Sequence, residues 1–291
     1  CGHCKKSTPI LKEFYEKWYG PNNATMVIAG DIDIAQTKKW VDRYFAEIPA
    51  KAAVESLQPR LGKLDGVKRF MHEDNFAQVP EMRMVWPTVQ DGHPDSYALQ
   101  YLGELLSDGK RAPLYKELVE KRKVAASPGA FNRTREISGD FSIIVRANAG
   151  VDLDDAYAGT MDALKAFEQN EIDDKDMERI KNSLETEFYN GLSSVFFKAF
   201  QLASANEYNG SPEALKTEIA KTLAVTKEDV KRVYDKYVKN QPFILTSFVP
   251  KGKAELAVAN SSKAEVEEEP VVQGAEAPPM EETEAKYDRT P

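Results

Sequence analysis

Apolar residues in the first fifty positions recur at spacings that predict a helix, a buried strand and a second helix. Between positions 6 and 19 they occupy one face of a helix: Ile10, Leu11, Phe14, Tyr15 and Trp18. Residues 24–29 (ATMVIA) form a nearly continuous apolar run, which favours a buried strand. Residues 34–45 predict a second helix, and Ile48 and Pro49 close it.

From position 67 to position 250, strands and helices are segregated along the chain instead of alternating. The predicted strands are residues 67–73, 78–86, 125–133, 140–147 and 243–249. The predicted helices are one that starts at 93–95, followed by 112–123, 153–169, 173–208, 212–222 and 226–238. This segregation predicts an α+β fold with mostly antiparallel sheets packed against helices.

Composition and periodicity together divide the chain into four segments. We expect residues 1–55 to belong to a first domain, 56–66 to be a linker, and 67–250 to form a second domain. Residues 251–291 are acidic, rich in proline and nearly free of aromatics. Such a composition buries too little apolar surface to offset chain entropy, so we expect a disordered acidic tail. A spacer to a further domain is favoured over an interaction tail.

The charge of the chain limits its partners. A net charge of −8 and the absence of a basic stripe argue against nucleic acid. No apolar run approaches the roughly 18 to 20 residues that would span a bilayer, so we predict no transmembrane segment. Both cysteines, Cys1 and Cys4, lie in the first four positions, so the rest of the chain needs an ordinary hydrophobic core.

The candidate metal ligands do not form a convincing site. His72, Glu73 and Asp74 are consecutive in a predicted strand, so their side chains alternate between its two faces and cannot easily converge on one ion. His93 precedes Pro-Asp and fits a helix start better than a ligand. We therefore predict no metal-binding residue in this chain.

Acidic residues at element ends have a simpler role than catalysis. Asp31 and Asp33 follow the first predicted strand, where capping of the next helix is favoured over metal binding. Aspartates at 154–155 and 173–174 stand at predicted helix starts, where the helix dipole favours negative charge. Nucleotide-binding and hydrolase motifs (G-x-x-x-x-G-K-[ST], G-x-G-x-x-G and G-x-S-x-G) are absent from the sequence. We predict no catalytic or cofactor-binding residue among these groups.

Several segments in order resemble one family. Residues 14–49 (FYEKWYGPNNATMVIAGDIDIAQTKKWVDRYFAEIP) are similar to a segment of the pitrilysin/insulinase-type zinc peptidases, the inverzincins. The shared pattern is an aromatic-rich helix, Y-x-P-N-N-x, an apolar strand that ends G-D-x-D, and a helix that ends Y-F-x-x-I-P. Residues 93–126 and 139–156 resemble the opening helices and the next strand of the family's second domain. The resemblance covers about residues 14–250. It implies that residues 1–55 are the C-terminal remnant of a first peptidase-like domain, and that 67–250 are a second, non-zinc-binding one.

The zinc motif of that family is missing from this chain. The family requires H-x-x-E-H on a helix and a distant glutamate, and the zinc then activates a bound water. The three histidines, His3, His72 and His93, form no such motif. The resemblance therefore implies that zinc belongs to the full-length family protein and that this piece is inactive alone. Val119 and Ala126 stand where some members carry a substrate-positioning Arg–Tyr pair, which implies a copy of the domain that does not position substrate.

The first residues offer a different chemistry. Residues 1–17, with CGHC at their start, resemble the active-site helix of thioredoxin-like proteins. A C-x-x-C at a helix N-terminus lowers the pKa of its first thiol, so Cys1 and Cys4 are the candidate redox residues. The buried strand and the opposing proline of such a site are not evident, and Val79–Pro80 is the one candidate for that proline. Thiol–disulfide oxidoreductase activity is therefore the alternative function.

The function that the family resemblance implies is a non-catalytic one. Family members enclose peptides in a clamshell chamber, and the second domain supplies chamber wall. The implied partners are a peptide substrate and a zinc-bearing half or subunit. A catalytically silent assembly subunit is a further alternative. The resemblance to bacterial envelope members implies a periplasmic or cell-envelope location.

Overall fold

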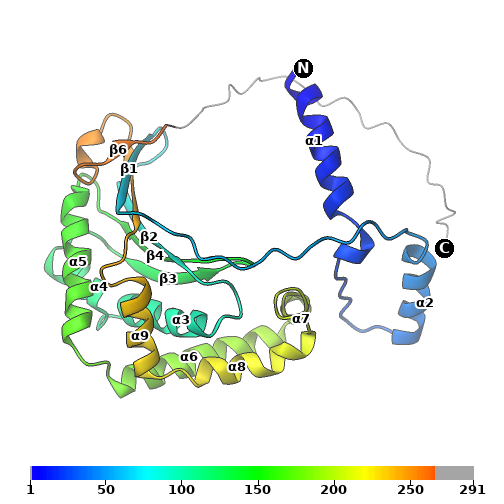
Figure 1. Cartoon of the computed structure of the whole chain (residues 1–291). Helices are drawn as coiled ribbons and strands as arrows, with labels where there is room; N and C mark the ends of the chain where they lie inside the picture. Colours follow the sequence, from blue (N-terminus) through cyan, green and yellow to red (C-terminus); the bar gives the residue numbers. More distant parts are fainter. Residues whose placement is uncertain (1, 266–291) are drawn as a thin grey trace. The chain divides into compact units, whose positions relative to one another are not determined.

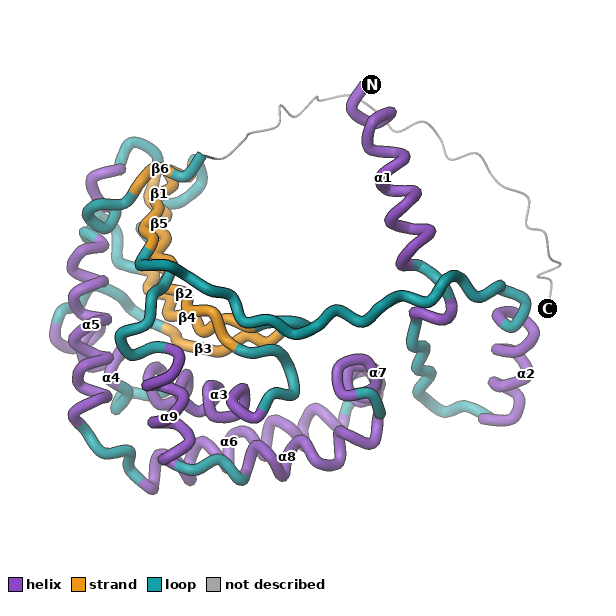
Figure 2. Tube along the Cα trace, in the orientation of Figure 1, coloured by secondary structure: helices purple, strands orange, loops and turns teal. Residues whose placement is uncertain are grey.

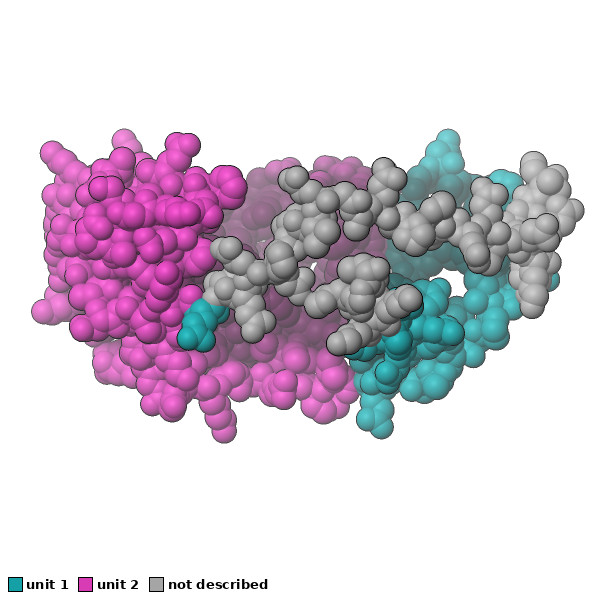
Figure 3. All heavy atoms as spheres, turned by 90° about the horizontal axis from the view of Figure 1, so that it is seen from above, with its two compact units in different colours: residues 1–55, 265–291 teal, residues 56–264 magenta. Residues whose placement is uncertain are grey.

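The chain divides into two compact units. The computed structural model describes residues 2–265, and the side chains from position 8 onward. Ser56–Ala264 form one unit, and the described residues before Ser56 belong to the other (Figure 3). In the described part of the chain, no helix is long and apolar enough to cross a membrane.

The first unit consists of two helices and the extended chain around them. α1 spans Gly2–Trp18, the 3₁₀ turn η1 spans Pro21–Asn23, and α2 spans Ile34–Phe45. Asn22 links the turn to the chain that follows α2. Its Oδ1 accepts a hydrogen bond from the Lys51 N–H at 2.9 Å, and its amide donates to the Lys51 carbonyl oxygen at 3.2 Å.

The strand predicted at residues 24–29 is not formed. This segment has no strand partner in the described part of the chain. Met26, Val27 and Ile28 are correspondingly exposed. A strand needs a neighbouring strand for its backbone hydrogen bonds, and the described residues of this unit form helices and extended chain without strand pairing.

Within the second unit, six strands form one sheet in the order β3-β4-β2-β5-β1-β6. The strands are β1 Lys68–Asp74, β2 Glu81–Thr88, β3 Gly129–Thr134, β4 Gly139–Arg146, β5 Ile244–Pro250 and β6 Ser262–Lys263. Neighbouring strands from β3 to β5 are antiparallel, whereas β1 is parallel to both β5 and β6. The α+β fold with a mostly antiparallel sheet is therefore confirmed.

Helices cover one face of this sheet and leave the other uncovered (Figures 1 and 2). Along β2, buried and half-buried residues alternate strictly, as a strand with one covered face requires. Met82, Met84 and Trp86 point into the helical layer and are at most 1% exposed. We call the other side, which carries Glu81 and Arg83 of β2, the open face.

The helical layer follows the predicted order with two changes. Its longer helices are α3 Pro94–Ser107, α5 Leu153–Gln169, α6 Asp174–Ser193, α7 Val195–Asn209, α8 Leu215–Leu223 and α9 Lys227–Tyr237. The helix predicted at 112–123 is a short α4, Pro113–Tyr115, that continues as the π-helix η2, Lys116–Lys121. The helix predicted at 173–208 is broken at Ser194, because this residue is extended (φ −85°, ψ 126°) and its side chain caps α7.

Residues 251–264 belong to the second unit, which corrects the prediction of a disordered tail from position 251. β6 pairs with β1, and Val258 is 1% exposed. The Val258 N–H donates a hydrogen bond to the hydroxyl oxygen of Ser247 at 3.2 Å. The apolar residues of this segment therefore pack on the sheet before the strongly acidic sequence begins. Residues 266–291 lie outside the described residues.

Candidate functional site

The candidate metal ligands of β1 are engaged in local structure. Glu73 Oε1 accepts a hydrogen bond from the Gly252 N–H at 2.9 Å, and Asp74 Oδ1 accepts one from the Phe76 N–H at 2.6 Å. The His72 ring packs edge-on against Phe248, with 6.0 Å between ring centroids. In the described part of the chain, no three His, Cys, Asp or Glu side chains are grouped in a way that could hold a metal ion.

Two of the acidic residues predicted at element ends, Asp33 and Asp173, cap helices. Asp33 Oδ1 accepts a hydrogen bond from the Gln36 N–H at 2.7 Å and thereby caps α2. Asp173 caps α6 by accepting a hydrogen bond from the Lys175 N–H at 3.0 Å. His93 is the N-cap of α3, and its Nδ1 accepts a hydrogen bond from the Asp95 N–H at 3.0 Å.

Asp95 is a buried carboxylate that sequence reasoning did not single out. It is 4% exposed in the first turn of α3. Three groups of α9 donate hydrogen bonds to it: Arg232 at 2.6 Å, Lys236 at 2.9 Å and the Tyr237 hydroxyl at 2.6 Å. Burial opposes ionisation, but the hydrogen bonds from Tyr237, Lys236 and Arg232 outweigh it and hold the pKa of Asp95 well below its usual range. Asp95 therefore stays charged, and its hydrogen bonds stabilise the contact between α3 and α9.

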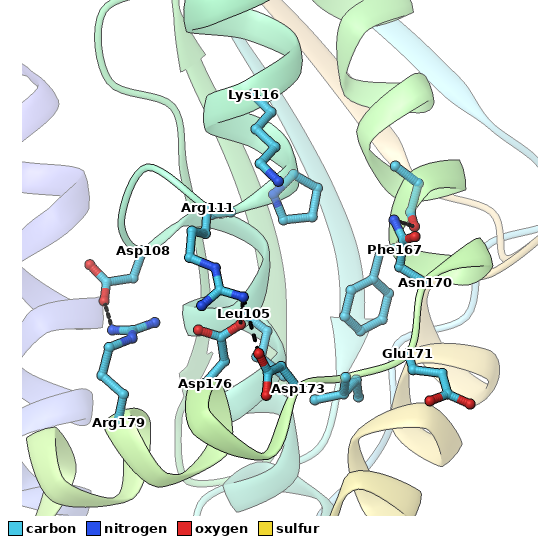
Figure 4. A pocket seen from close by; sticks show the side chains of 14 residues that line it. Leu105, Asp108, Arg111, Lys116, Phe167, Asn170, Glu171, Asp173, Asp176 and Arg179 are labelled. Atoms are coloured by element: carbon cyan, nitrogen blue, oxygen red, sulfur yellow. Dashed lines mark hydrogen bonds and ion pairs between the residues drawn. The ribbon is translucent and has the colours of Figure 1, made fainter.

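A pocket of about 260 Å³ lies between the start of α4 and the junction of α5 and α6 (Figure 4). Arg111 points across it toward Asp173 at 3.0 Å and Asp176 at 3.9 Å, and Arg179 pairs with Asp108 (Figure 4). The capping hydrogen bond from Lys175 and then the one from Arg111 lower the pKa of Asp173. Because these carboxylates are paired with arginines, none is poised for acid–base catalysis.

A second pocket, of about 520 Å³, lies among α3, α6, α7, α8 and β3. The Tyr97 hydroxyl donates a hydrogen bond to Glu218 Oε2 at 2.7 Å. Burial, and next the Glu218 carboxylate, raise the pKa of Tyr97, so its proton is held firmly. The pocket thus offers a polar lining but no nucleophile paired with a base.

The other predicted positions concern substrate positioning and thiol chemistry. Ala126 is exposed and lines a third hollow, on the open face, whereas Val119 lies in η2 and is half-buried. The Val79–Pro80 peptide bond is trans, unlike the proline of a thioredoxin-like site. Cys1 and the side chain of Cys4 lie outside the described part of the chain, so the redox interpretation stays a prediction.

Sequence comparison gives a family for this arrangement. A family model described as "Peptidase M16 inactive domain" matches residues 9–184. The zinc protease PqqE of Helicobacter pylori is 22% identical over 186 residues, which are 63% of this chain and 42% of that protein. The probable zinc protease PqqL of Escherichia coli is 26% identical over 179 residues, which are 60% of this chain and 19% of that protein. The chain thus spans less than half the length of these two relatives.

Solved structures share the fold. A protease from Helicobacter pylori superposes with a TM-score of 0.73 at 21% identity, over 82% of this chain and 58% of that one. A peptidase M16 inactive domain from Pseudomonas fluorescens superposes with a TM-score of 0.67 at 19% identity, over 82% of this chain and 56% of that one. These similarities bear on the fold alone, because identity is low.

Proposed function

The chain belongs to the family of peptidase M16 inactive domains, and from this premise we propose that it is the non-catalytic part of a zinc peptidase system. In this proposal it contributes wall to a peptide-enclosing chamber, and a separate half or subunit carries the zinc. The observation that carries the proposal is the family match over residues 9–184 together with the lack of H-x-x-E-H in the sequence. The relatives named zinc proteases are longer than this chain, which is consistent with catalytic residues in one half and a non-catalytic domain in the other.

The surface of α7 supports a role that depends on a partner. Phe196, Phe197 and Phe200 are 72%, 56% and 64% exposed on this one helix. Clustered exposed aromatics of this kind mark contacts with another protein or domain, because their burial removes a large apolar area from water. In our proposal, a zinc-bearing half is the partner that covers this surface.

The proposed location is the periplasm. One structural relative is described as the first half of the periplasmic protease PqqL from Escherichia coli; at 20% identity, it covers 84% of this chain. Fractionation of cells that express the full-length gene tests the location. Recovery with a cytoplasmic marker enzyme instead of a periplasmic one would contradict it.

A complementation assay tests the function. The purified chain is mixed with a family half that carries H-x-x-E-H, and cleavage of an unstructured fluorogenic peptide is followed. We expect cleavage only in the mixture, with loss on adding a zinc chelator and with zinc bound by the partner. Stoichiometric zinc in this chain alone, with chelator-sensitive cleavage, would overturn the proposal. A mixture that associates but gains no cleavage would favour the silent assembly subunit instead.

A further inference from the structure

The open face of the sheet is hollowed at the end where β2, β3 and β4 meet. The hollow has a volume of about 540 Å³. Its lining includes Glu81, Ala126, Ser127, Gly129, Ile144 and Arg146. Most of these residues have small or aliphatic side chains. The two charged residues among them lie on paired strands, with Glu81 of β2 opposite Arg146 of β4.

Two guanidinium groups share one carboxylate at this hollow. The Nε and Nη2 atoms of Arg146 lie 3.3 Å and 3.1 Å from Glu81 Oε2. Arg83 Nη2 lies 3.7 Å from Glu81 Oε1, too far for a good hydrogen bond. The Nε atom of Arg83 is buried and has no hydrogen-bond partner among the described residues. One positive charge and one buried donor are therefore left unmatched.

Arg83 lies beside the hollow, because its partner on the neighbouring strand lines it. Arg83 pairs with Ile144, which in turn pairs with Gly129 on β3. A Cβ atom on Gly129 would have nothing within 4 Å, so the space beside this part of β3 is empty of protein. A ligand can therefore approach the backbone here and reach Arg146, which lines the hollow.

Further along β3, the open face carries another unmatched cation. Arg133 stacks on Phe131, with its guanidinium carbon 5.5 Å from the ring centroid. Asp140 lies opposite it on β4 but pairs with Arg135 at 2.7 Å. Arg133 has no ion-pair partner within the described residues. On β2, β3 and β4, the open face thus carries more arginines than carboxylates, on a chain whose net charge is −8.

We propose that this hollow binds a carboxylate group of an extended peptide. The carboxylate sits against the exposed guanidinium of Arg146, which also contacts Glu81, and a neighbouring small apolar side chain packs on Ile144 and Ala126. Charge complementarity identifies the ligand class, because Arg83 and Arg146 share the single carboxylate of Glu81 and because hydrogen bonds from arginine to a carboxylate are among the strongest that proteins form. The inference goes beyond the proposed function, since binding needs no zinc-bearing partner.

Fluorescence anisotropy with the full 291-residue chain tests the site. The probe is a fluorescein-labelled, C-terminally amidated peptide of alanine and valine with two glutamates, and its matched peptide has glutamines instead. We expect the glutamate peptide to bind about tenfold or more tightly, with affinity falling as salt is raised. A third peptide, with glutamines and a free C-terminus, separates the two sources of carboxylate. Binding comparable to the glutamate peptide assigns the terminal group, and weak binding assigns the side chain.

Three variants locate the binding. Arg146→Gln should weaken binding of the glutamate peptide by about tenfold. Ala126→Phe should block the hollow, and both residues are exposed enough for the fold to tolerate the change. Arg179→Gln, which alters an arginine paired with Asp108 in the helical layer, should leave binding unchanged. Equal affinity for the glutamate and glutamine peptides, or full binding by both Arg146→Gln and Ala126→Phe, would overturn the proposal.

Discussion

Asp95 is the residue on which the contact between α3 and α9 depends most. Replacing it by asparagine removes a buried charge that Arg232, Lys236 and Tyr237 all contact. We expect Asp95→Asn to lower the free energy of unfolding by about 2 to 4 kcal/mol at pH 7. The folded-state pKa of Asp95 is depressed, so this stabilisation is present above the unfolded pKa of about 3.9 and is lost as pH falls below it. Urea unfolding of both proteins between pH 7 and pH 2 measures the difference.

Asp235→Asn is the matched control, because Asp235 is exposed on the same helix and pairs with Lys239 only at 3.8 Å. It should change stability by less than about 0.5 kcal/mol. A deficit of Asp95→Asn that stays constant down to pH 2 would rule out the charge-based explanation.

Interactions between residues close in sequence can be predicted from the sequence, whereas interactions between residues far apart in sequence cannot. Thr226 and Asp229 form the capping box that their spacing predicts, with Thr226 Oγ1 accepting from the Asp229 N–H at 3.2 Å. Asp95, by contrast, meets Arg232 across 137 positions of sequence. Arg83 lies between Met82 and Met84 in the sequence, but the burial of its Nε depends on packing with the neighbouring strands β4 and β5, which are distant along the chain.

At the scale of elements, α3 and β3 approach closely at Gly103. A Cβ atom there would stand 2.8 Å from the Ala130 carbonyl oxygen and 3.0 Å from the Phe131 Cα, both backbone atoms that cannot rotate away. Glycine to alanine inside a helix normally stabilises by about 0.5 to 1 kcal/mol. We expect Gly103→Ala instead to destabilise by about 1 to 3 kcal/mol, because it overpacks the contact. Denaturant unfolding measures the sign.

Gly191 in α6 provides the comparison. A Cβ there would meet the side-chain amide nitrogen of Gln201 at 2.9 Å, and that flexible side chain can move. Gly191→Ala should therefore not destabilise the protein. If Gly103→Ala proved as well tolerated as Gly191→Ala, the close packing of α3 on β3 would be refuted.

Element types were predictable where periodicity is strong, and failures have identifiable causes. The strand predicted at residues 78–86 is found as β2, Glu81–Thr88, in which buried and half-buried residues alternate because one face of the strand is covered. The break at Ser194 was missed because apolar residues continue on both sides of it. The segment 251–264 was assigned to the tail because its few apolar residues, such as Val258, were averaged with the acidic sequence that follows. Residues 24–29 have strand composition, but strand formation depends on pairing that composition does not supply.

At the scale of the whole molecule, the two units differ sharply in how much they bury. The second unit has a continuous core in which Trp86, Tyr101 and Phe141 are at most 1% exposed. Between residues 8 and 55, Gly20 alone is buried. Most large apolar side chains of this first unit are instead exposed, among them Phe14 and Trp40 at 53% each. Burial of apolar surface is the main stabilising contribution to folding, so these two units cannot be equally stable.

Hydrogen exchange followed by mass spectrometry should reveal this difference directly. In the chain alone we expect the amides of α2 to exchange within the earliest time points, while those of β2 and β4 stay protected, because opening free energy follows local burial. Adding the zinc-bearing half of the proposed function should slow exchange in α2, since a partner that covers Trp40 and its apolar neighbours stabilises the helix by mass action. Strands β2 and β4 are the internal control, because they should exchange at the same rate with and without the partner. Strong protection of α2 in the chain alone would mean that its apolar face is already covered, and the partner would then not be needed to fold this unit.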